Sequence, residues 1–597
     1  MEKIIKLSDY IANFLKELEV RHVFVFSGGA SLHLIHSIDN VPEIEFICPQ
    51  HEQAGAMAAD GYARCTSGIG VAIATSGPGA TNLLTGTCCS FYDSVPTMMI
   101  TGQVSTTRMR GDSGVRQIGF QETSTVEIFK PVTKYASLLT DPSKIRYELE
   151  KAYHIATNGR PGPVLLDIPD NLQRELINPD ELKGYIPEEK TILATDFSAE
   201  ILQIADLIDK AERPVAIFGW GVHLAKAEKE ALDFVSLMGI PVAPTWAAAD
   251  IIPSEHELNI GTFGTHGTRY GNFAVQNSDL ILSLGSRLDT KSTGSPISTF
   301  ARGAYKVVLD LDLSEIKKFE RFGLNIDMPI HADVKVFLNQ ALSKLKFKSK
   351  LRFGNWIAKI KTWKETYPIC PKKYWKEEKV NPYCLIEELS AKSNEGDLFF
   401  IDTGCSIAWM MQGFAVKKGQ RLYHDFNNTA MGWALAASIG ASFAHPKRNI
   451  ICVTGDGSLQ INIQELATII RHNLPIKILL LNNHGHSMIQ QTQDQWLGSK
   501  YLASSVNGGL ASPDFCKIAT AYGLKASTIQ KNSEIREVLN ILLRENTPSL
   551  CDIDIDSNHR VVPQVKFGFP NEDPHPLLPR KEFAKNMIID SATKLKS

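Results

Sequence analysis

One stretch, residues 450–483, constrains the fold of this chain more than any other. An apolar run at 450–454 precedes Gly455-Asp456-Gly457-Ser458, and a second apolar run at 476–481 ends in Asn482-Asn483. Two short apolar runs rich in β-branched residues, separated by one helical segment, predict a βαβ unit with parallel strands. Asp456 and Asn483 would then leave the carboxyl ends of neighbouring strands, where open α/β sheets bind their ligands.

The residues at this edge predict a site for a metal-bound diphosphate. A carboxylate beside an amide oxygen suits a hard divalent cation such as Mg²⁺, which takes few protein ligands and adds phosphate oxygens. Gly455 and Gly457 let the backbone approach a phosphate, and the following helix offers free N–H groups and the positive end of its dipole. Gly-Asp-Gly alone is mostly an ordinary turn, so the prediction depends on the flanking strand and helix and on Asn482-Asn483.

Length and composition predict a cytoplasmic protein of several domains, with no nucleic-acid or membrane partner. At 597 residues the chain exceeds a single core, and 43% hydrophobic with 21% charged residues is ordinary for a globular protein. A net charge of −2 gives no electrostatic basis for binding nucleic acid or an anionic membrane. The N-terminus lacks a signal-peptide hydrophobic segment, and the ten cysteines show no Cys-x-x-Cys spacing.

The order of the expected elements indicates an α/β protein with three doubly wound parallel-sheet domains. In residues 1–180, short strands alternate with helices and most strands end at glycine turns, which is typical of a parallel sheet covered on both faces. Residues 197–345 and 381–560 repeat the pattern. Between these domains we expect a linker at 178–196 and a lysine-rich helical crossover at 344–379 with a solvated face, and after them, at 561–597, an arm ending in a helix.

The pattern from Gly455-Asp456-Gly457 to Asn482-Asn483 resembles the cofactor motif of thiamine diphosphate (ThDP) enzymes. In that chemistry the imino form of the cofactor's aminopyrimidine removes the thiazolium C2 proton, and a carboxyl group on the opposite ring nitrogen generates the imino form. Glu52 starts a helix directly after a strand, among alanines and methionines, and suits this catalytic role. Position alone would equally allow a helix-terminal acid stabilised by the helix dipole.

Further segments, in colinear order over about residues 5–555, resemble acetohydroxyacid (acetolactate) synthases. The likeness implies a homodimer or homotetramer in which Glu52 of one subunit acts on cofactor held by another. The segments are Pro49-Gln50-His51-Glu52-Gln53, Thr75-Ser76-Gly77-Pro78-Gly79-Ala80-Thr81-Asn82, Gly102-Gln103-Val104, Phe120-Gln121-Glu122-Thr123, Arg160-Pro161-Gly162-Pro163 and Ala430-Met431-Gly432.

The resemblance also implies roles for single residues. Asp456, Asn483 and the carbonyl of Gly485 would hold the metal, and Met431 would support the bent cofactor. Without the resemblance, Met431 would be ordinary core. The other positions implied to contact the cofactor are Gly404, Cys405, Ser406, Gly432, Gly457, Ser458 and Met488. Those implied to face the substrates are Gly28, Gly29, Phe120, Gln121 and Thr492, several of which would otherwise be turn glycines or core residues.

The chain departs from the synthases at positions that bear on the substrate. Cys405 and Ser406 replace the Gln and His of the diphosphate loop, and Thr492 stands where the synthases have a tryptophan near the acceptor. A smaller, more polar wall would admit an acceptor bulkier than pyruvate or 2-oxobutyrate. Two segments, 111–117 and 576–580, resemble a branch of the family tied to bacterial surface-saccharide synthesis, which joins an acetyl unit from pyruvate to a keto-sugar nucleotide.

The middle domain leaves the presence of FAD open. Segments that align with the flavin site of the synthases are Gly219-Trp220-Gly221, His266-Gly267-Thr268, Gly285-Ser286-Arg287-Leu288-Asp289, Asp310-Leu311-Asp312 and His331-Ala332-Asp333. The full Gly-x-Gly-x-x-Gly fingerprint is absent, and Lys291 stands where the motif continues with arginine. Catabolic relatives keep this domain without flavin, and a shared fold does not guarantee a shared ligand.

Together these features predict a ThDP- and Mg²⁺-dependent enzyme that decarboxylates a 2-oxo acid, with pyruvate as the expected donor. The two-carbon unit would be added to a second carbonyl compound. The acceptor stays open between another 2-oxo acid, giving acetolactate, and a keto-sugar nucleotide or other bulky ketone. A simple decarboxylase or C–C lyase is a third alternative. A catalytically silent relative is disfavoured by the intact Glu52, Asp456 and Asn483.

Overall fold

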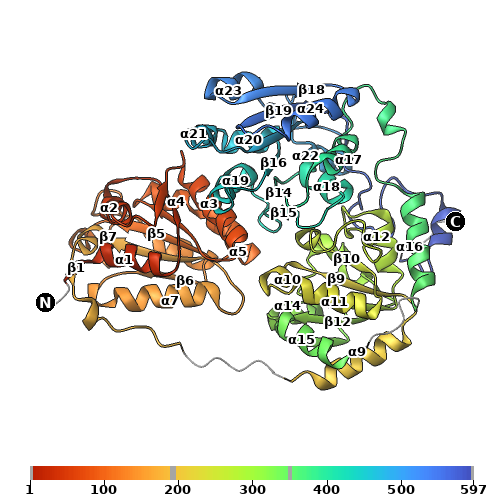
Figure 1. The fold of residues 1–597 in the computed structure, drawn as a ribbon, viewed down its shortest axis with the longest axis horizontal. Helices are drawn as coiled ribbons and strands as arrows, with labels where there is room; N and C mark the ends of the chain where they lie inside the picture. Colours follow the sequence, from red (N-terminus) through yellow and green to blue (C-terminus); the bar gives the residue numbers. More distant parts are fainter. Residues whose placement is uncertain (1–3, 188–195, 347–351, 593–597) are drawn as a thin grey trace.

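The computed structural model describes residues 4–187, 196–346 and 352–592, and it contains three parallel sheets with helices packed around them (Figure 1). The predicted class, α/β with doubly wound parallel sheets, is confirmed. Two of the sheets have six strands and the middle one has five. A short antiparallel pair, β1 (Ile5–Lys6) with β8 (Leu176–Ile177), joins the two ends of the N-terminal domain.

Each sheet is built from strands of a single domain, named in spatial order from one edge to the other. The N-terminal sheet is β3 (Glu45–Ile47), β2 (His22–Val25), β4 (Gly70–Ala74), β5 (Thr97–Gln103), β7 (Val164–Pro169) and β6 (Tyr135–Leu138). The middle sheet is β10 (Val242–Pro244), β9 (Pro214–Phe218), β11 (Leu280–Leu284), β12 (Tyr305–Asp310) and β13 (Met328–His331). The C-terminal sheet is β15 (Arg421–Tyr423), β14 (Leu398–Ile401), β16 (Ile450–Gly455), β17 (Lys477–Asn482), β19 (Ser549–Asp554) and β18 (Lys525–Ile529).

Alternate residues of the central strands enter two separate cores, one on each face of the sheet. In β16, Ile451 and Val453 belong to one core, whereas Ile450 and Cys452 belong to the other. Because both faces are buried, the strand needs a continuous apolar sequence rather than an alternating one. This is why the apolar runs predict the strands well.

Helices pack against the sheets of all three domains. In the N-terminal domain they are α2 (Leu32–Asp39), α3 (Glu52–Thr66), α4 (Pro78–Asn82) and α5 (Leu84–Asp93). In and beside the middle domain they are α10 (Trp220–Leu224), α12 (Arg269–Gln276), α13 (Thr290–Thr293), α16 (Gly354–Thr366) and α25 (Arg580–Asn586). In the C-terminal domain they are α17 (Pro382–Lys392), α18 (Cys405–Gly413), α19 (Trp433–Ala444), α20 (Asp456–Ile461) and α22 (Ser487–Trp496).

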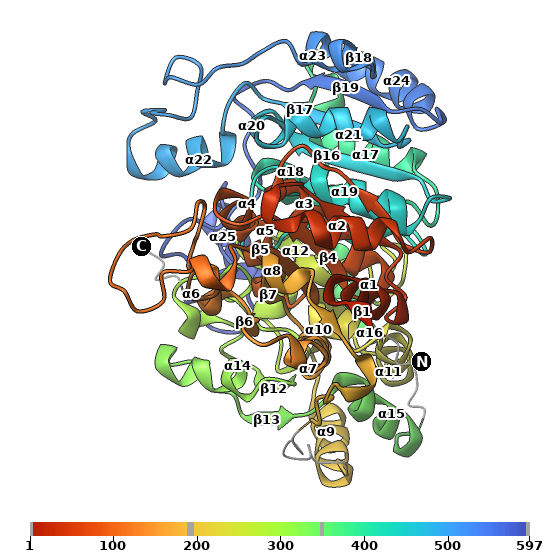
Figure 2. The same ribbon diagram turned by 90° about the vertical axis from the view of Figure 1, so that its left-hand side faces the viewer.

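Helices α3 and α19 form the contact between the outer domains, and Figure 2 shows them side by side. Two glycines make this contact close: a Cβ on Gly61 would clash with the carbonyl oxygen of Ala437, and one on Gly440 with that of Ala58. Nearby, the buried Arg64 pairs with Asp60 at 2.7 Å and with Asp93 at 2.8 Å. The close packing of α3 on α19 therefore fixes α3 relative to the C-terminal domain of the same chain.

The crossover at 344–379 differs in part from the expected solvated helix. Lysines of α16 do face solvent, but Trp356, Ile360 and Trp363 are buried in the core of the middle domain. The last helix, α25, also packs there, since the Trp363 indole N–H donates to Asn586 Oδ1 at 2.8 Å. The linker expected at 178–196 lies only partly within the described residues.

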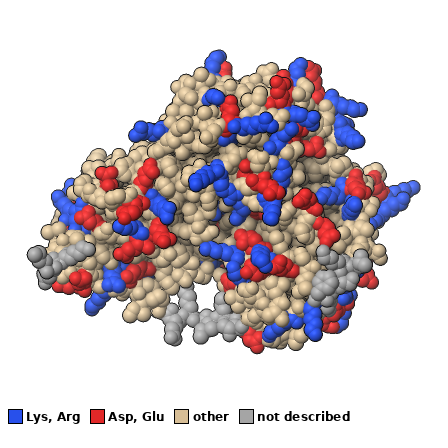
Figure 3. All heavy atoms as spheres, in the orientation of Figure 1, with Lys and Arg blue, Asp and Glu red and all other residues tan. Residues whose placement is uncertain are grey.

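Charges of both signs are interspersed on the face shown in Figure 3. Among the described residues, no helix combines the length and the apolar character that a bilayer span requires.

Candidate active site and middle-domain cleft

Asp456 and Asn483 follow neighbouring parallel strands, as the sequence pattern predicts. Strands β16 and β17 pair in register, with Gly455 opposite Leu481. The Asp456 side chain is buried, and this burial raises its pKa to about 6, although the backbone N–H groups of Gly457 and Gly485 act in the opposite direction. Within the described structure, no cation forms an ion pair with this carboxyl group.

Asn483 gives the clearest sign of a missing partner. Its Oδ1 atom is buried and accepts no hydrogen bond from any described residue, and the Ser487 hydroxyl is in the same situation. A buried polar group without a partner costs about 1–3 kcal/mol, so a bound cation or its water would recover that loss. Asp456, Asn483 and the Gly485 carbonyl offer hard oxygen atoms, which fit Mg²⁺. No cluster of three His, Cys, Asp or Glu side chains suited to a metal occurs among the described residues, so the amide oxygen is essential to this set.

The start of α18 adjoins the Asp456 loop. Gly404 has φ +83°, and the space where its Cβ would lie is open, so the backbone N–H groups at this helix start can face a ligand. The Ser406 hydroxyl lies 3.6 Å from the place of a Cβ on Gly455. Burial raises the pKa of Cys405 to about 12, which keeps the thiol neutral. A neutral thiol does not repel a diphosphate.

Met431 reaches the same loop. A Cβ on Gly457 would lie 3.1 Å from Met431 Cε and 2.5 Å from His486 Nε2, so only glycine fits between these side chains. Gly432 has φ +83° and its carbonyl accepts a hydrogen bond from Asn462 Nδ2 at 3.0 Å. The structure thus brings Met431, Gly432 and Gly457 together. Ser458 is buried one residue further along α20.

Glu52 is buried at the start of α3 and is held by Asn82. Its Oε2 accepts from Asn82 Nδ2 at 2.9 Å, and its Oε1 faces Gly79, where a Cβ would lie 3.3 Å away. The chain on either side of Glu52 contacts the C-terminal domain: the Gln50 N–H donates to Glu465 Oε1 at 2.9 Å. Glu52 itself has no hydrogen bond to the Asp456 loop in the part of the chain that is described.

The residues expected to face the substrates fall into two groups. Gly28 packs against the Thr75 side chain with no room for a Cβ, whereas the space beside Gly29 is open. Gln121 has φ +64° and packs on Gly77. A Cβ added to Gly77 would lie 3.0 Å from the Cβ of Gln121. Phe120 is 83% exposed, so within one chain it lines no closed pocket.

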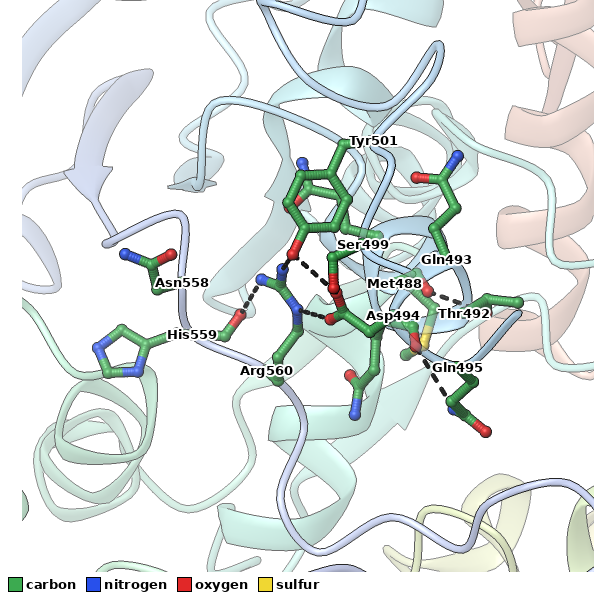
Figure 4. Close-up of polar contacts among 12 residues, drawn as sticks. Met488, Thr492, Gln493, Asp494, Gln495, Ser499, Tyr501, Asn558, His559 and Arg560 are labelled. Atoms are coloured by element: carbon green, nitrogen blue, oxygen red, sulfur yellow. Dashed lines mark hydrogen bonds and ion pairs between the residues drawn. The ribbon is translucent and has the colours of Figure 1, made fainter. Parts of the chain in front are cut away.

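Helix α22 carries Met488 and Thr492 one turn apart, so both lie on the same face. The Thr492 hydroxyl donates to the Met488 carbonyl at 3.2 Å, which leaves its methyl group as the larger free surface. Figure 4 shows Thr492 apart from a polar cluster centred on Arg560. In this cluster Arg560 pairs with Asp494 at 3.0 Å, and the Tyr501 hydroxyl donates to Asp494 at 2.7 Å. The C-terminal tail is therefore anchored to α22.

A cleft of about 390 Å³ lies between the middle domain and both outer domains. Each of the five segments noted for flavin contributes to its lining, through residues such as Trp220, His266 and Asp310. The Trp220 indole N–H is buried without a partner among the described residues. Arg160 enters from the N-terminal domain and pairs with Glu315 at 2.8 Å. Phe426 and Asn427 come from the C-terminal domain and were not expected from the sequence, because the loop after β15 has no motif of its own.

The comparisons with known proteins agree with this geometry. Three family models of thiamine pyrophosphate enzymes match: the N-terminal TPP binding domain at residues 5–128, the central domain at 201–341 and the C-terminal TPP binding domain at 402–553. The chain is 35% identical to acetolactate synthase 3, chloroplastic, of Brassica napus, over 94% of this chain and 85% of the relative. It is 34% identical to acetolactate synthase, chloroplastic, of Arabidopsis thaliana, over 94% and 83%. It is 33% identical to the acetolactate synthase large subunit of Pyropia yezoensis, over 96% of each.

Proposed function

Because the chain belongs to the ThDP-dependent enzymes of the acetolactate synthase type, we propose that it decarboxylates pyruvate and joins the two-carbon unit to a second carbonyl compound. In this proposal residues 1–180 bind the pyrimidine end of the cofactor and residues 381–560 bind the diphosphate and Mg²⁺. Residues 197–345 form the central domain, and 561–597 form a C-terminal arm.

One observation carries the proposal: Asp456 and Asn483 follow two neighbouring parallel strands, and the buried Asn483 Oδ1 has no partner in the described parts of the chain. Asp456, Asn483 and the Gly485 carbonyl would hold Mg²⁺. The cofactor's diphosphate would then meet Cys405 and Ser406 at the start of α18, together with residues around the Asp456 loop. Those further contacts are Gly404, Met431, Gly432, Gly457, Ser458 and Met488.

Glu52 is proposed to move the proton that starts the reaction. Its Oε2 accepts a hydrogen bond from Asn82, which leaves Oε1, beside Gly79, to hold a proton against a ring nitrogen. Bound ThDP supplies an electron sink for the loss of CO₂ from a 2-oxo acid. The protein contributes orientation and a site from which water is excluded.

Two acceptors are proposed for the second step. Another 2-oxo acid, giving acetolactate, follows from the activity for which the relatives are named. A bulkier ketone such as a keto-sugar nucleotide is favoured by Thr492, which gives the acceptor side of α22 a small side chain instead of an indole. Gly28, Gly29, Phe120 and Gln121 would supply the other side of this pocket.

We also propose that the middle-domain cleft takes FAD as a structural ligand. The cleft is large, and its five matching segments meet in one place. The Trp220 N–H, which has no partner among the described residues, would gain an acceptor there. Absorbance at the flavin band of protein purified without added cofactor tests this directly.

A homodimer or homotetramer is proposed because large apolar side chains near the site are exposed in a single chain. Phe120 is 83% exposed, and both Trp496 and Phe567 are 61% exposed. A second copy covering these residues would bring Glu52 of one chain to cofactor held by the other. The cytoplasm is proposed as the compartment, since all ten cysteines are free thiols.

Product identification tests the function. The purified protein would be incubated with ¹³C-labelled pyruvate, ThDP and Mg²⁺, with and without a candidate acceptor, and the products followed by NMR. Labelled acetolactate supports the first acceptor, and a labelled adduct of an added keto-sugar nucleotide supports the second. Acetaldehyde alone would indicate a simple decarboxylase, and no release of CO₂ under any condition would contradict the proposal.

A further inference from the structure

Residues 561–565 of the C-terminal tail run between two walls that belong to different domains. One wall is helix α22, where Gln491 Oε1 accepts from the Val561 N–H at 3.0 Å. The other is the middle-domain loop that carries His266, where the Thr265 carbonyl accepts from the Val565 N–H at 2.8 Å. Figure 1 shows the dark blue tail passing from the C-terminal domain to the middle domain. The tail therefore touches both the acceptor side of α22 and the lining of the cleft.

The side chain of Gln564 connects the two walls directly. Its Oε1 accepts from Gln491 Nε2 at 2.6 Å, and its Nε2 lies 3.0 Å from His266 Nε2. Its backbone is fixed as well, because Gln564 and His575 exchange both backbone hydrogen bonds, at 3.0 and 2.7 Å. Gln491 and Gln564 are buried, so water cannot easily replace these bonds.

The direction of each hydrogen bond follows from the donors available. Gln491 donates to the amide oxygen of Gln564, so the amide NH₂ of Gln564 must donate to His266. His266 Nε2 then accepts, and the ring hydrogen sits on Nδ1, which lies 3.2 Å from Thr265 Oγ1. Burial, assisted by the nearby Lys291 charge, lowers the pKa of His266 to about 4, so the imidazole is neutral near pH 7. The amide at 564 can accept from one wall and donate to the other at the same time.

We propose that Gln564 is a positioning residue for the acceptor half of the reaction: it holds the face of α22 that carries Met488 and Thr492 against the wall of the middle-domain cleft. The inference rests on the proposed function, which assigns that face to the acceptor. Gln491 keeps a second bond, to the Val561 carbonyl at 2.9 Å, so α22 stays attached to the tail without Gln564. What is lost without it is the side-chain link to His266, which leaves the Val565–Thr265 backbone bond as the tail's remaining hold on this wall.

Hydrogen exchange measured by mass spectrometry tests the link without relying on activity. Gln564→Leu is expected to raise exchange about tenfold in peptides covering both α22 and residues 261–268, the factor that one or two net hydrogen bonds supply. Gln493→Leu is the matched control. Gln493 is also buried on α22, but it donates to the Leu502 carbonyl at 2.8 Å and makes no contact with the cleft loop. This variant should change hydrogen exchange only in α22 and in residues 502–504.

Gln564→Glu separates positioning from general packing as a conservative rescue of Gln564→Leu. An ionised carboxyl group at 564 still accepts from Gln491, and it can also accept from His266 if the neutral ring carries its hydrogen on Nε2 and the Thr265 hydroxyl, 3.2 Å from Nδ1, donates to that nitrogen. Gln564→Glu therefore keeps both links of the bridge, whereas Gln564→Leu keeps neither. The ratio of carboligated product to released CO₂, with pyruvate as donor and acceptor, should fall about fivefold in Gln564→Leu and stay near the wild-type value in Gln564→Glu.

The outcomes are distinct. If Gln564→Leu leaves exchange in residues 261–268 unchanged, or if Gln564→Glu loses carboligation as fully as Gln564→Leu, Gln564 has no positioning role. If the wild type releases CO₂ from pyruvate but forms no carboligated product, the proposed function fails, whereas the exchange experiment still decides the link. Equal changes in the Gln493→Leu and Gln564→Leu variants in both regions would show general destabilisation and would also overturn the inference.

Discussion

The N-terminal and C-terminal domains have the same sheet but present different chemistry on it. Numbered along each domain, the strands of both sheets follow the order 2-1-3-4-6-5. After the third strand, the N-terminal domain turns at Gly77 into α4, whereas the C-terminal domain places Asp456 at the start of α20. After the second strand, the N-terminal domain has Glu52, and the C-terminal domain has the loop that leads to Met431.

The difference between the two domains shows how much of the site is determined by the sheet topology. A parallel sheet collects the residues that follow its strands at one edge, whatever their chemistry. The residue type then decides the role: Glu52 with Asn82 forms a buried hydrogen-bonded carboxyl group, whereas Asp456 follows the strand next to that of Asn483, whose Oδ1 has no hydrogen-bond partner among the described residues. One fold thus supplies both a candidate proton-transfer end and a candidate metal end, and substitutions in each should fail in different ways.

Glu52→Gln should have the largest effect, and it should act on chemistry alone. Gln keeps a side-chain oxygen for the bond from Asn82 but cannot transfer the proton. We expect turnover of pyruvate and exchange of the ThDP C2 proton to fall by about 10²–10⁴, the range for losing a general acid–base group. ThDP binding, followed by calorimetry, should change little. Asn82→Ala is the companion variant, and it should give a smaller loss because the carboxyl group remains. Unchanged proton exchange in Glu52→Gln would remove the proposed role.

Asp456→Asn should show the opposite behaviour at the other edge. The substitution keeps the size of the side chain but removes the negative charge that would balance Mg²⁺. We expect metal-dependent retention of ThDP to weaken about 10–100-fold, as for loss of a group that supports a metal site. Saturating ThDP and Mg²⁺ should restore part of the turnover, which they could not do for Glu52→Gln. Tight, metal-independent retention by this variant would contradict the ligand assignment.

Thr492→Trp should have a narrower effect, on the second substrate only. An indole would fill the space beside Met488, so a bulky acceptor should be excluded while CO₂ release continues. We expect carboligation of a bulky ketone to fall about 10–100-fold relative to pyruvate self-condensation, as for a filled apolar pocket. Leu497→Trp is the control, because Leu497 is 49% exposed and follows α22 five residues after Thr492, off the face that Met488 and Thr492 share. An equal loss in both variants would show that Thr492 does not line the acceptor pocket.

The sequence predicted the parts of the molecule that depend on local patterns. Strands such as β16 and β17 were predicted because these buried runs are apolar throughout, and the positions of Asp456 and Asn483 at their ends were predicted because polar residues follow such runs directly. The common strand order of the outer domains was not predicted, since the pairing of β7 between β5 and β6 joins residues far apart in the chain.

Contacts between distant segments account for what sequence reasoning missed. Nothing in the tail around Gln564 marks it as the partner of both Gln491 and His266, because these residues are 73 and 298 positions away. Asn82 was noted only as part of a motif, and its bond to Glu52 appears only in the fold. Phe120 was expected to line a pocket, and its exposure in one chain shows that this prediction depends on a second copy.

The smallest effect tests whether the two sheets share a buried acid. Burial raises the pKa of Asp167 in the N-terminal sheet and of Asp402 in the C-terminal sheet, each to about 7. Asp167 accepts from the Thr101 hydroxyl at 2.7 Å, and Asp402 accepts from the Thr454 hydroxyl at 2.6 Å. These donors favour the charged form but offset the loss of solvation only in part, so folding favours the neutral form of each carboxyl group.

A carboxyl group whose pKa is higher in the folded state contributes stability at low pH, and this contribution is lost as pH rises through the folded value. Asp167→Asn and Asp402→Asn imitate the neutral form, and each amide can still donate to the threonine hydroxyl. We therefore expect the Tm of the wild type to fall between pH 5 and pH 8. The Tm of each variant should fall by a few degrees less over the same range. Thermal unfolding of metal-free protein at several pH values measures this. If only one variant flattens the dependence of Tm on pH, the two domains share a strand order but their buried acids ionise differently. A steeper dependence in either variant would contradict the raised pKa of that acid.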